Sequence, residues 1–336
     1  MTKLLVVVGA TGMQGGSVIN WFQQHESTWR IRGLTRDPSS AAASDLAKSG
    51  IEMVKADLFD LDSLQAAFRG ANYIFAFTDF GALMKGALAR FQAGEIAAPI
   101  GAETYRLEAS QGRNIADAAA TVPELERLVF STEPNVKRLS GGKYEHVYHF
   151  DAKAAGLEYM LGLDALKGKV SAVMLGVFVA SVKKIQHLWG LKMVDRIAVW
   201  SPPFEADLPL PWVDVQRDLG SFVEALIRTS APTQVFVVSE WLSGQQWLDQ
   251  WTKVTGVQAR YEAGMSLHER VDKDPTGLSL HFSQTMRYIE DFGYTCGDPS
   301  VLMPEELEAK GCSVHRTGVA DYIDRESWSE IVRQAS

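Results

Sequence analysis

Gly9, Gly12 and Gly15 stand between an apolar run at residues 4–8 and a stretch with helical periodicity. This GxxGxxG spacing suits pyrophosphate binding, because the first glycine permits a tight turn and the second lets backbone N–H groups approach the phosphates. The third lets the helix pack closely on the strand, and the helix N-terminus adds partial positive charge. We therefore expect a dinucleotide site in this loop, with further contacts from Thr11, Met13 and Gln14.

The residues after the second expected strand indicate which dinucleotide fits. A carboxylate at this place binds the ribose hydroxyls of NAD, whereas this chain has Thr35 and Arg36, followed by Asp37. The planar guanidinium of Arg36 can bind a 2′-phosphate, and Thr35 can donate a hydroxyl. This favours NADP(H) over NAD(H), with a solvated Arg36 that pairs with Asp37 as the alternative.

Two further strand ends complete the expected cofactor site. Asp57 and Leu58 follow the strand expected at 52–56, where a side chain would meet the adenine edge. Phe77 and Thr78 lie at the end of the next strand and would be near the pyrophosphate and the nicotinamide ribose.

Composition excludes several other classes of protein. The 336 residues include 33 Lys and Arg against 41 Asp and Glu, and the net charge of −8 does not favour direct nucleic-acid binding. Cys296 and Cys312 have no metal-ligand spacing, so we expect a reducing compartment and no metal. The apolar run at 4–8 is too short for a signal peptide or a membrane span, which predicts a cytoplasmic protein, also possible in the nucleus.

Short β-branched runs alternate with amphipathic stretches, as is typical of βαβ units. Strands are expected at 4–8, 29–35, 52–56, 73–77, 127–131, 170–175, 197–200 and 234–238. Helices are expected at 14–24, 41–49, 61–68, 103–120, 218–228, 244–255 and 283–291. The connection at 78–102 is long enough for a partly helical lid or an active-site loop.

This order predicts an α/β fold, with a Rossmann-type parallel sheet that carries helices on both faces. Residues 1–165 would form the NAD(P)-binding domain. Residues 166–336 would add late strands to the sheet and form a smaller α/β domain for a substrate or a partner. Proline-rich, turn-rich segments at 200–204 and 208–212 interrupt the alternation in this half.

The chain resembles the NmrA-like family of atypical short-chain dehydrogenase relatives. The resemblance rests on GATGMQG at 9–15, TRDP at 35–38, STEPNVK at 131–137, HFDAK at 149–153, PF at 203–204, LPLPWVD at 208–214 and DLG at 218–220. It covers about the first 230 residues well and the remainder poorly. The family implies a Rossmann domain with a small C-terminal α/β domain, and it contains both NADP-sensing regulators and NADPH-dependent reductases.

One departure from ordinary short-chain dehydrogenases concerns the proton donor. Those enzymes place a tyrosine four residues before a lysine that binds the nicotinamide ribose, whereas Lys153 is preceded at that spacing by His149. His149 can act as a general acid, or it is inert in a protein that only senses the cofactor. Ser131 and Thr132, at the end of a strand, can place a hydroxyl beside a substrate carbonyl or cap a helix.

Aromatic residues in the second half suggest a substrate pocket. Trp189, Trp200, Phe204 and Trp212 would cover the nicotinamide, or else pack in the core, and Phe80 and Phe178 are further candidate contacts. The sequence thus predicts an NADPH-dependent oxidoreductase that reduces a carbonyl or conjugated double bond of a small aromatic or polyketide-like metabolite. The alternative is an NADP(H)-sensing regulator without turnover that controls a transcription factor or another protein partner.

Overall fold

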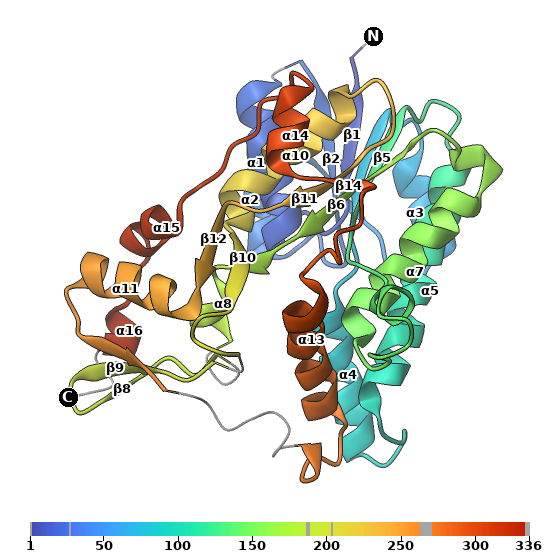
Figure 1. The fold of residues 1–336 in the computed structure, drawn as a ribbon. Coiled ribbons are helices and arrows are strands. Elements are labelled where there is room, and N and C mark those ends of the chain that lie inside the picture. The colour runs from blue at the N-terminus through green and yellow to red at the C-terminus, as the bar shows by residue number, and fades with distance from the viewer. Residues whose placement is uncertain (1, 27, 186–188, 203, 263–270, 333–336) are drawn as a thin grey trace.

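A parallel sheet with the strand order β14-β11-β6-β5-β4-β1-β2-β3 forms the centre of the fold. The computed structural model describes residues 2–26, 28–185, 189–202, 204–262 and 271–332 (Figure 1). The sheet comprises β1 (Leu4–Val7), β2 (Arg30–Thr35), β3 (Glu52–Lys55), β4 (Tyr73–Ala76), β5 (Arg127–Thr132), β6 (Val170–Leu175), β11 (Gln234–Val237) and β14 (Val301–Leu302). The chain reverses its order between β1 and β4, where doubly wound sheets bind ligands at the carboxyl ends of their strands. The predicted Rossmann-type fold is confirmed.

Strand alternation divides the core between the two faces of this sheet. On β1, Leu4 and Val6 join one apolar cluster, whereas Leu5 and Val7 join the other. The first face is covered by α3 (Leu61–Phe68), α5 (Ile100–Ala120) and α7 (Tyr148–Gly162), and the second by α1 (Met13–His25), α2 (Ala41–Lys48) and α10 (Val215–Arg228). Successive side chains of a strand therefore pack alternately against one helical layer and the other.

The later part of the chain adds two smaller sheets. One has the order β12-β10-β7 and comprises β7 (Val177–Phe178), β10 (Pro209–Val213) and β12 (Glu240–Ser243). The other has the order β13-β9-β8 and comprises β8 (Lys192–Val194), β9 (Ile197–Trp200) and β13 (Ala259–Tyr261). Around them lie α8 (Ser181–Lys184), α11 (Gly244–Thr255), α13 (Leu278–Phe292), α15 (Val319–Arg325) and α16 (Ser329–Val332), while α14 (Pro304–Ala309) packs on the main sheet.

Most expected elements are present, with shifted ends. The connection at 78–102 contains α4 (Phe80–Gln92), so it is partly helical as predicted; α6 (Val136–Leu139) and the 3₁₀ turn η1 (Asp164–Leu166) flank α7. The segment at 208–212 is not simply a turn, because it contributes to β10. Its prolines at 209 and 211 are tolerated since β7 pairs only with Trp212 and Val213.

We propose a domain boundary near residue 165, because the elements beyond it supply most of a further, aromatic-rich core in addition to the strands β6, β11 and β14. Figure 1 shows α11, α15 and α16 lying together, away from the main sheet.

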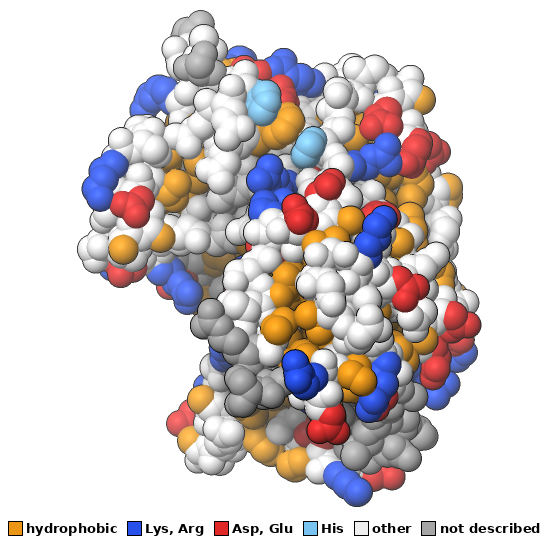
Figure 2. Space-filling view, turned by 90° about the vertical axis from the view of Figure 1, so that its left-hand side faces the viewer, with side chains coloured by type: hydrophobic (Ala, Val, Ile, Leu, Met, Phe, Trp, Pro, Cys, Tyr) orange, Lys and Arg blue, Asp and Glu red, His pale blue; other side chains and the backbone are white. Residues whose placement is uncertain are grey.

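Basic and acidic side chains are interspersed over the face of the molecule drawn in Figure 2. Among the described helices, none combines the length and the apolar character needed to cross a membrane.

Candidate active site

The glycine loop between β1 and α1 has a backbone that side chains would obstruct. Gly9 has φ +63°, and a Cβ there would lie 2.6 Å from the Phe77 ring. A Cβ on Gly15 would lie 2.3 Å from the carbonyl oxygen of Gly9, so the third glycine does permit the close approach of helix and strand. Phe77, a predicted cofactor residue, thus packs directly against the turn.

The N-terminus of α1 is free of side-chain caps. Gly12 occupies the N-cap position without a side-chain hydrogen bond, and the first turn carries no acidic residue. Thr11 is exposed, Met13 is half-buried, and the Oε1 atom of Gln14 is buried without a partner among the described residues. Uncapped amides at a helix N-terminus fit a pyrophosphate.

The end of β2 presents a basic residue to solvent. Arg36 is exposed and makes no ion pair with any described residue, whereas Asp37 accepts a 2.9 Å hydrogen bond from the Ser39 amide. The structure therefore does not contain the ion pair between Arg36 and Asp37 that the alternative interpretation requires. Lys55, which the sequence analysis missed, is the β3 partner of Thr35 and adds a second exposed cation at this edge.

The loop after β3 is held by local hydrogen bonds. Asp57 accepts from the Phe59 amide at 2.9 Å, and the Asp57 amide donates to Ser63 Oγ at 3.1 Å. The Leu58 carbonyl accepts from the Asn114 side chain at 2.8 Å. Asp57 and Leu58 therefore lie at the same carboxyl edge as the glycine loop, in a loop tied to α5.

Lys153 lies at the centre of a buried polar cluster between α5 and α7. Its Nζ atom is 2.5 Å from Glu108 Oε1, and Thr78 donates to the same oxygen at 2.7 Å. Glu108 is 0% exposed, and its Oε2 atom has no partner among the described residues. The structure thus brings together the predicted residues Thr78 and Lys153 through a carboxylate that was not predicted.

A second carboxyl group faces this cluster. Glu133 follows β5, its Oε2 atom is buried without a partner in the described chain, and the Tyr294 hydroxyl lies beside it. Burial raises the pKa of Glu133 well above its usual value, and the Lys153 charge opposes that shift. The sequence analysis missed both acids, although the sequence contains a signal for each. Glu108 interrupts a stripe of small and apolar residues on a helix, and Glu133 directly follows a buried strand.

His149 lies one turn before Lys153 on α7, in a cluster of aromatic rings. Its ring centroid is 4.7 Å from that of His281 on α13 and 5.8 Å from that of Phe80 on α4. Burial, then His281 and the Lys153 charge, lower the pKa of His149 well below its ordinary value. Burial likewise lowers the pKa of His281 to about 4. Both imidazoles are therefore neutral at pH 7.

Ser131 and Thr132 lie on opposite faces of the sheet. Ser131 shares the side of Val129, which packs toward α1 and α10, whereas Thr132 shares the side of Phe130. Phe130 contacts the layer of α5 and α7, where Lys153 is found. The structure consequently places Thr132, rather than Ser131, on the lysine side of the sheet.

The predicted aromatic pocket is filled by packing. Trp200 and Trp212 are both 0% exposed, and the Trp200 ring lies 4.7 Å from that of Trp247. Trp189 and Phe204 belong to the same core cluster, while Phe178 is half-buried against the α10 layer. Trp200 and Trp212 present no surface to a ligand in this structure, and Trp189 presents very little, which does not support their assignment as substrate contacts.

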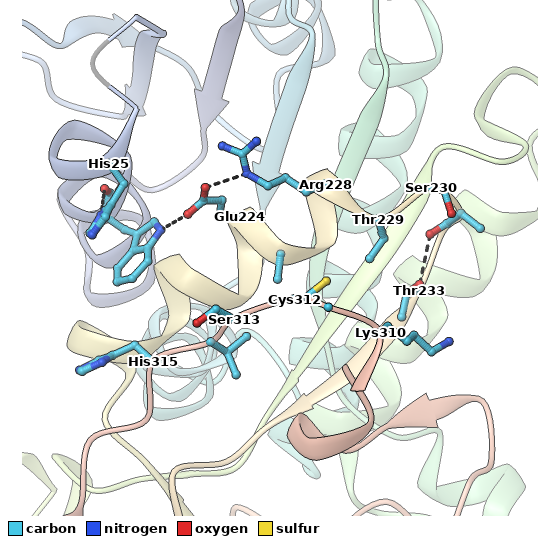
Figure 3. Close-up of a pocket in the computed structure, with 15 residues that line it drawn as sticks. His25, Glu224, Arg228, Thr229, Ser230, Thr233, Lys310, Cys312, Ser313 and His315 are labelled. Atoms are coloured by element: carbon cyan, nitrogen blue, oxygen red, sulfur yellow. Dashed lines mark hydrogen bonds and ion pairs between the residues drawn. The ribbon is translucent and has the colours of Figure 1, made fainter. Parts of the chain in front are cut away.

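A cleft of about 830 Å³ lies elsewhere, between the C-terminal ends of α1 and α10 and the segment at 310–315 (Figure 3). It is lined by residues that include Trp21, His25, Arg228 and Cys312. The glycine loop is at the other end of α1, and a helix of 13 residues is about 20 Å long. This cleft is therefore separate from the nucleotide edge.

Comparisons with known proteins agree with this architecture. The model of the NmrA-like family matches residues 1–323. The NmrA-like family domain-containing oxidoreductase malD of Malbranchea aurantiaca is 27% identical, and the match covers 91% of this chain and 87% of that protein.

Solved structures show the same fold. The negative transcriptional regulator NmrA superposes with a TM-score of 0.68 at 18% identity, covering 100% of this chain and 99% of that one. An NADPH-dependent quinone oxidoreductase from Escherichia coli gives a TM-score of 0.61 at 15% identity, covering 95% and 98%.

Proposed function

Because the chain belongs to the NmrA-like family, we propose that it is an NADPH-dependent oxidoreductase acting on a small aromatic or polyketide-like metabolite. The reaction would be reduction of a carbonyl or a conjugated double bond. The observation that carries this proposal is Lys153, held by the buried Glu108 at the carboxyl edge of the sheet. A relative named as an oxidoreductase over most of both chains supports the same class of activity.

The cofactor would lie along the carboxyl edge. Its pyrophosphate would meet the uncapped amides of α1 near Gly12, which include the backbone amide of Gln14. Thr35, Arg36 and Lys55 would bind the 2′-phosphate, which is why we propose NADP(H) rather than NAD(H). Asp57 and Leu58 would border the adenine, and Phe77 the nicotinamide end.

Lys153 would bind the nicotinamide ribose. An ammonium has three N–H donors, and Glu108 uses one of them, so donors remain for the ribose hydroxyls. When bound, NADPH supplies the hydride, and a proton must come from a group beside Lys153. The side chains placed there by the fold are His149 on α7 and Glu133 after β5.

The test is oxidation of NADPH across a panel of quinones, enones and aromatic ketones. Wild-type protein should turn over at least one class, and Lys153→Met should lower both turnover and NADPH affinity. Lys167→Met, which changes an exposed lysine beyond η1, is the matched control and should alter neither.

The structural match to NmrA over the whole chain favours one other candidate, an NADP(H)-sensing regulator. Such a protein would bind NADP(H) and change its association with a protein partner. If the protein binds NADP(H) tightly and turns over no compound of a broad panel, the regulatory function is favoured over the reductase.

A further inference from the structure

We propose that Glu133, and not His149, donates the proton in the reduction, an inference that rests on the proposed oxidoreductase function. Glu133 directly follows β5 (Arg127–Thr132), so it stands at the carboxyl edge where the sheet binds its ligands. The charges of Lys153 and Glu108 both act on the Glu133 carboxyl, so it faces the cluster that Thr78 also joins. The position is that of a group that acts on a bound substrate.

Burial of Glu133 favours its neutral acid form. Tyr294 follows α13, and its hydroxyl donates a hydrogen bond to the Leu175 carbonyl at 2.8 Å. The same hydroxyl lies beside the Glu133 carboxyl, and a hydrogen bond from it lowers the pKa of Glu133, but burial raises that pKa by more. The Oε2 atom of Glu133 is buried and has no donor among the described residues that would stabilise a carboxylate.

The charges of the cluster lead to the same assignment. Lys153 is the nearby cation, and its ion pair with Glu108 at 2.5 Å already balances one carboxylate. A second ionised carboxyl would leave the cluster with a net negative charge in a buried site, which is costly. Burial, and to a smaller extent the Glu108 charge, raise the pKa of Glu133, while the Lys153 charge and the Tyr294 hydrogen bond lower it. Tyr288 is the other titratable group that faces it.

Two carboxyl groups held in different states by their surroundings are the pattern of a charged partner and an acid. Here Glu108 is the charged partner of Lys153, and Glu133 is the acid. His149 is a weaker candidate, because burial lowers its pKa and keeps it neutral, and a neutral imidazole is a much poorer proton donor than a carboxylic acid.

In the proposed step, the substrate carbon accepts the hydride from NADPH, and the carbonyl oxygen, or the α-carbon of a conjugated system, accepts the proton of Glu133. The O–H bond of the carboxyl breaks and the corresponding bond to the substrate forms. Glu133 is left as a carboxylate, and the Lys153 charge offsets part of the cost of ionising it until it takes up another proton. A proton from solvent then restores the acid, so each cycle consumes one NADPH and one proton.

The kinetic test compares Glu133→Gln with His149→Gln. Removing a general acid should lower kcat by roughly 10²–10⁴, whereas His149→Gln should lower it less than about tenfold. NADPH affinity of Glu133→Gln, measured by calorimetry, should stay within about threefold of wild type. Glu133→Asp keeps a carboxyl and should retain part of the activity, and Glu124→Gln, at an exposed site, is the matched control.

The pH profile adds a signature that a structural role would not produce. Since the acid must be protonated, wild-type kcat should fall as pH rises through the pKa of Glu133, and Glu133→Gln should lose this alkaline limb. Infrared difference spectra of the cofactor-free protein, wild type minus Glu133→Gln, should show a protonated carboxyl band at pH 7.

Each outcome is decisive. Absence of that infrared band, or turnover that survives Glu133→Gln, overturns the donor role alone. Absence of wild-type turnover on the whole panel overturns the oxidoreductase function together with it. If His149→Gln lowers kcat as much as Glu133→Gln does, His149 remains a proton donor and the assignment to Glu133 alone is wrong.

Discussion

Glu108 and Lys153 form a 2.5 Å ion pair between α5 and α7, in which the carboxylate is completely buried. Thr78 donates to the same carboxylate oxygen from the end of β4. One oxygen therefore joins two helices and a strand end at the place where the nicotinamide is expected. The arrangement fixes the direction of Lys153 before any ligand arrives, which is the type of preorganisation that a cofactor site needs.

Glu108→Gln should destabilise the fold, because it leaves Lys153 without its charge partner. Breaking a buried pair costs roughly 3–5 kcal/mol, whereas removing both charges is far less harmful. The double variant Glu108→Gln, Lys153→Met should therefore be more stable than Glu108→Gln alone in urea unfolding at pH 7. A single-variant loss below about 1 kcal/mol would mean that the pair behaves as an exposed one.

Arg36→Asp should weaken NADPH binding much more than NADH binding. The structure leaves Arg36 exposed and without an ion pair in the described chain, so its guanidinium is available to a 2′-phosphate. Losing a charge-assisted contact costs on the order of 1.5–3 kcal/mol, which is more than tenfold in affinity. Calorimetric titration of both cofactors measures the difference, with Arg138→Gln as a surface control. Equal weakening of the two cofactors would remove Arg36 from the site.

Gly12→Val should prevent dinucleotide binding and leave the fold intact. A Cβ on Gly12 would meet nothing closer than 3.3 Å within the protein, yet the side chain would occupy the space of the pyrophosphate. Gly9→Ala is the contrasting variant, since its φ of +63° and the Phe77 ring at 2.6 Å should destabilise the fold itself. The readout is the rise in melting temperature on adding NADPH. An unchanged rise in Gly12→Val would disprove the phosphate assignment.

The first half of the fold could be predicted because local pattern and tertiary environment agree there. The strands β1 and β4 are buried apolar runs, and the glycine loop has the spacing that its geometry requires. The strand β10 was harder to recognise, because Pro209 and Pro211 normally signal turns, and only the short partner strand β7 makes them acceptable.

The active-site cluster could be predicted only in part. Thr78 and Lys153 followed from strand ends and helical spacing, but Glu108 lies 45 residues from Lys153 and is joined to it by the packing of α5 on α7. For the tryptophans the error is the reverse: they were predicted to contact a substrate, and the structure buries them in the core. Aromatic side chains suit a pocket and a core equally well, and burial of Trp200 and Trp212 depends on contacts that composition does not reveal.

Acid should destabilise the protein through His281, whose pKa burial lowers to about 4. The unfolded chain binds a proton at this histidine near pH 6.5, whereas the folded protein binds it only near pH 4. Between these values the unfolded state carries more protons, so the free energy of unfolding falls as pH decreases, by about 3 kcal/mol in total from this group. His281→Asn keeps a polar atom near the His146 carbonyl and should flatten that dependence. Urea unfolding at pH 7, 5.5 and 4.5 compares the two proteins, and parallel curves would show that His281 is not held neutral by the fold.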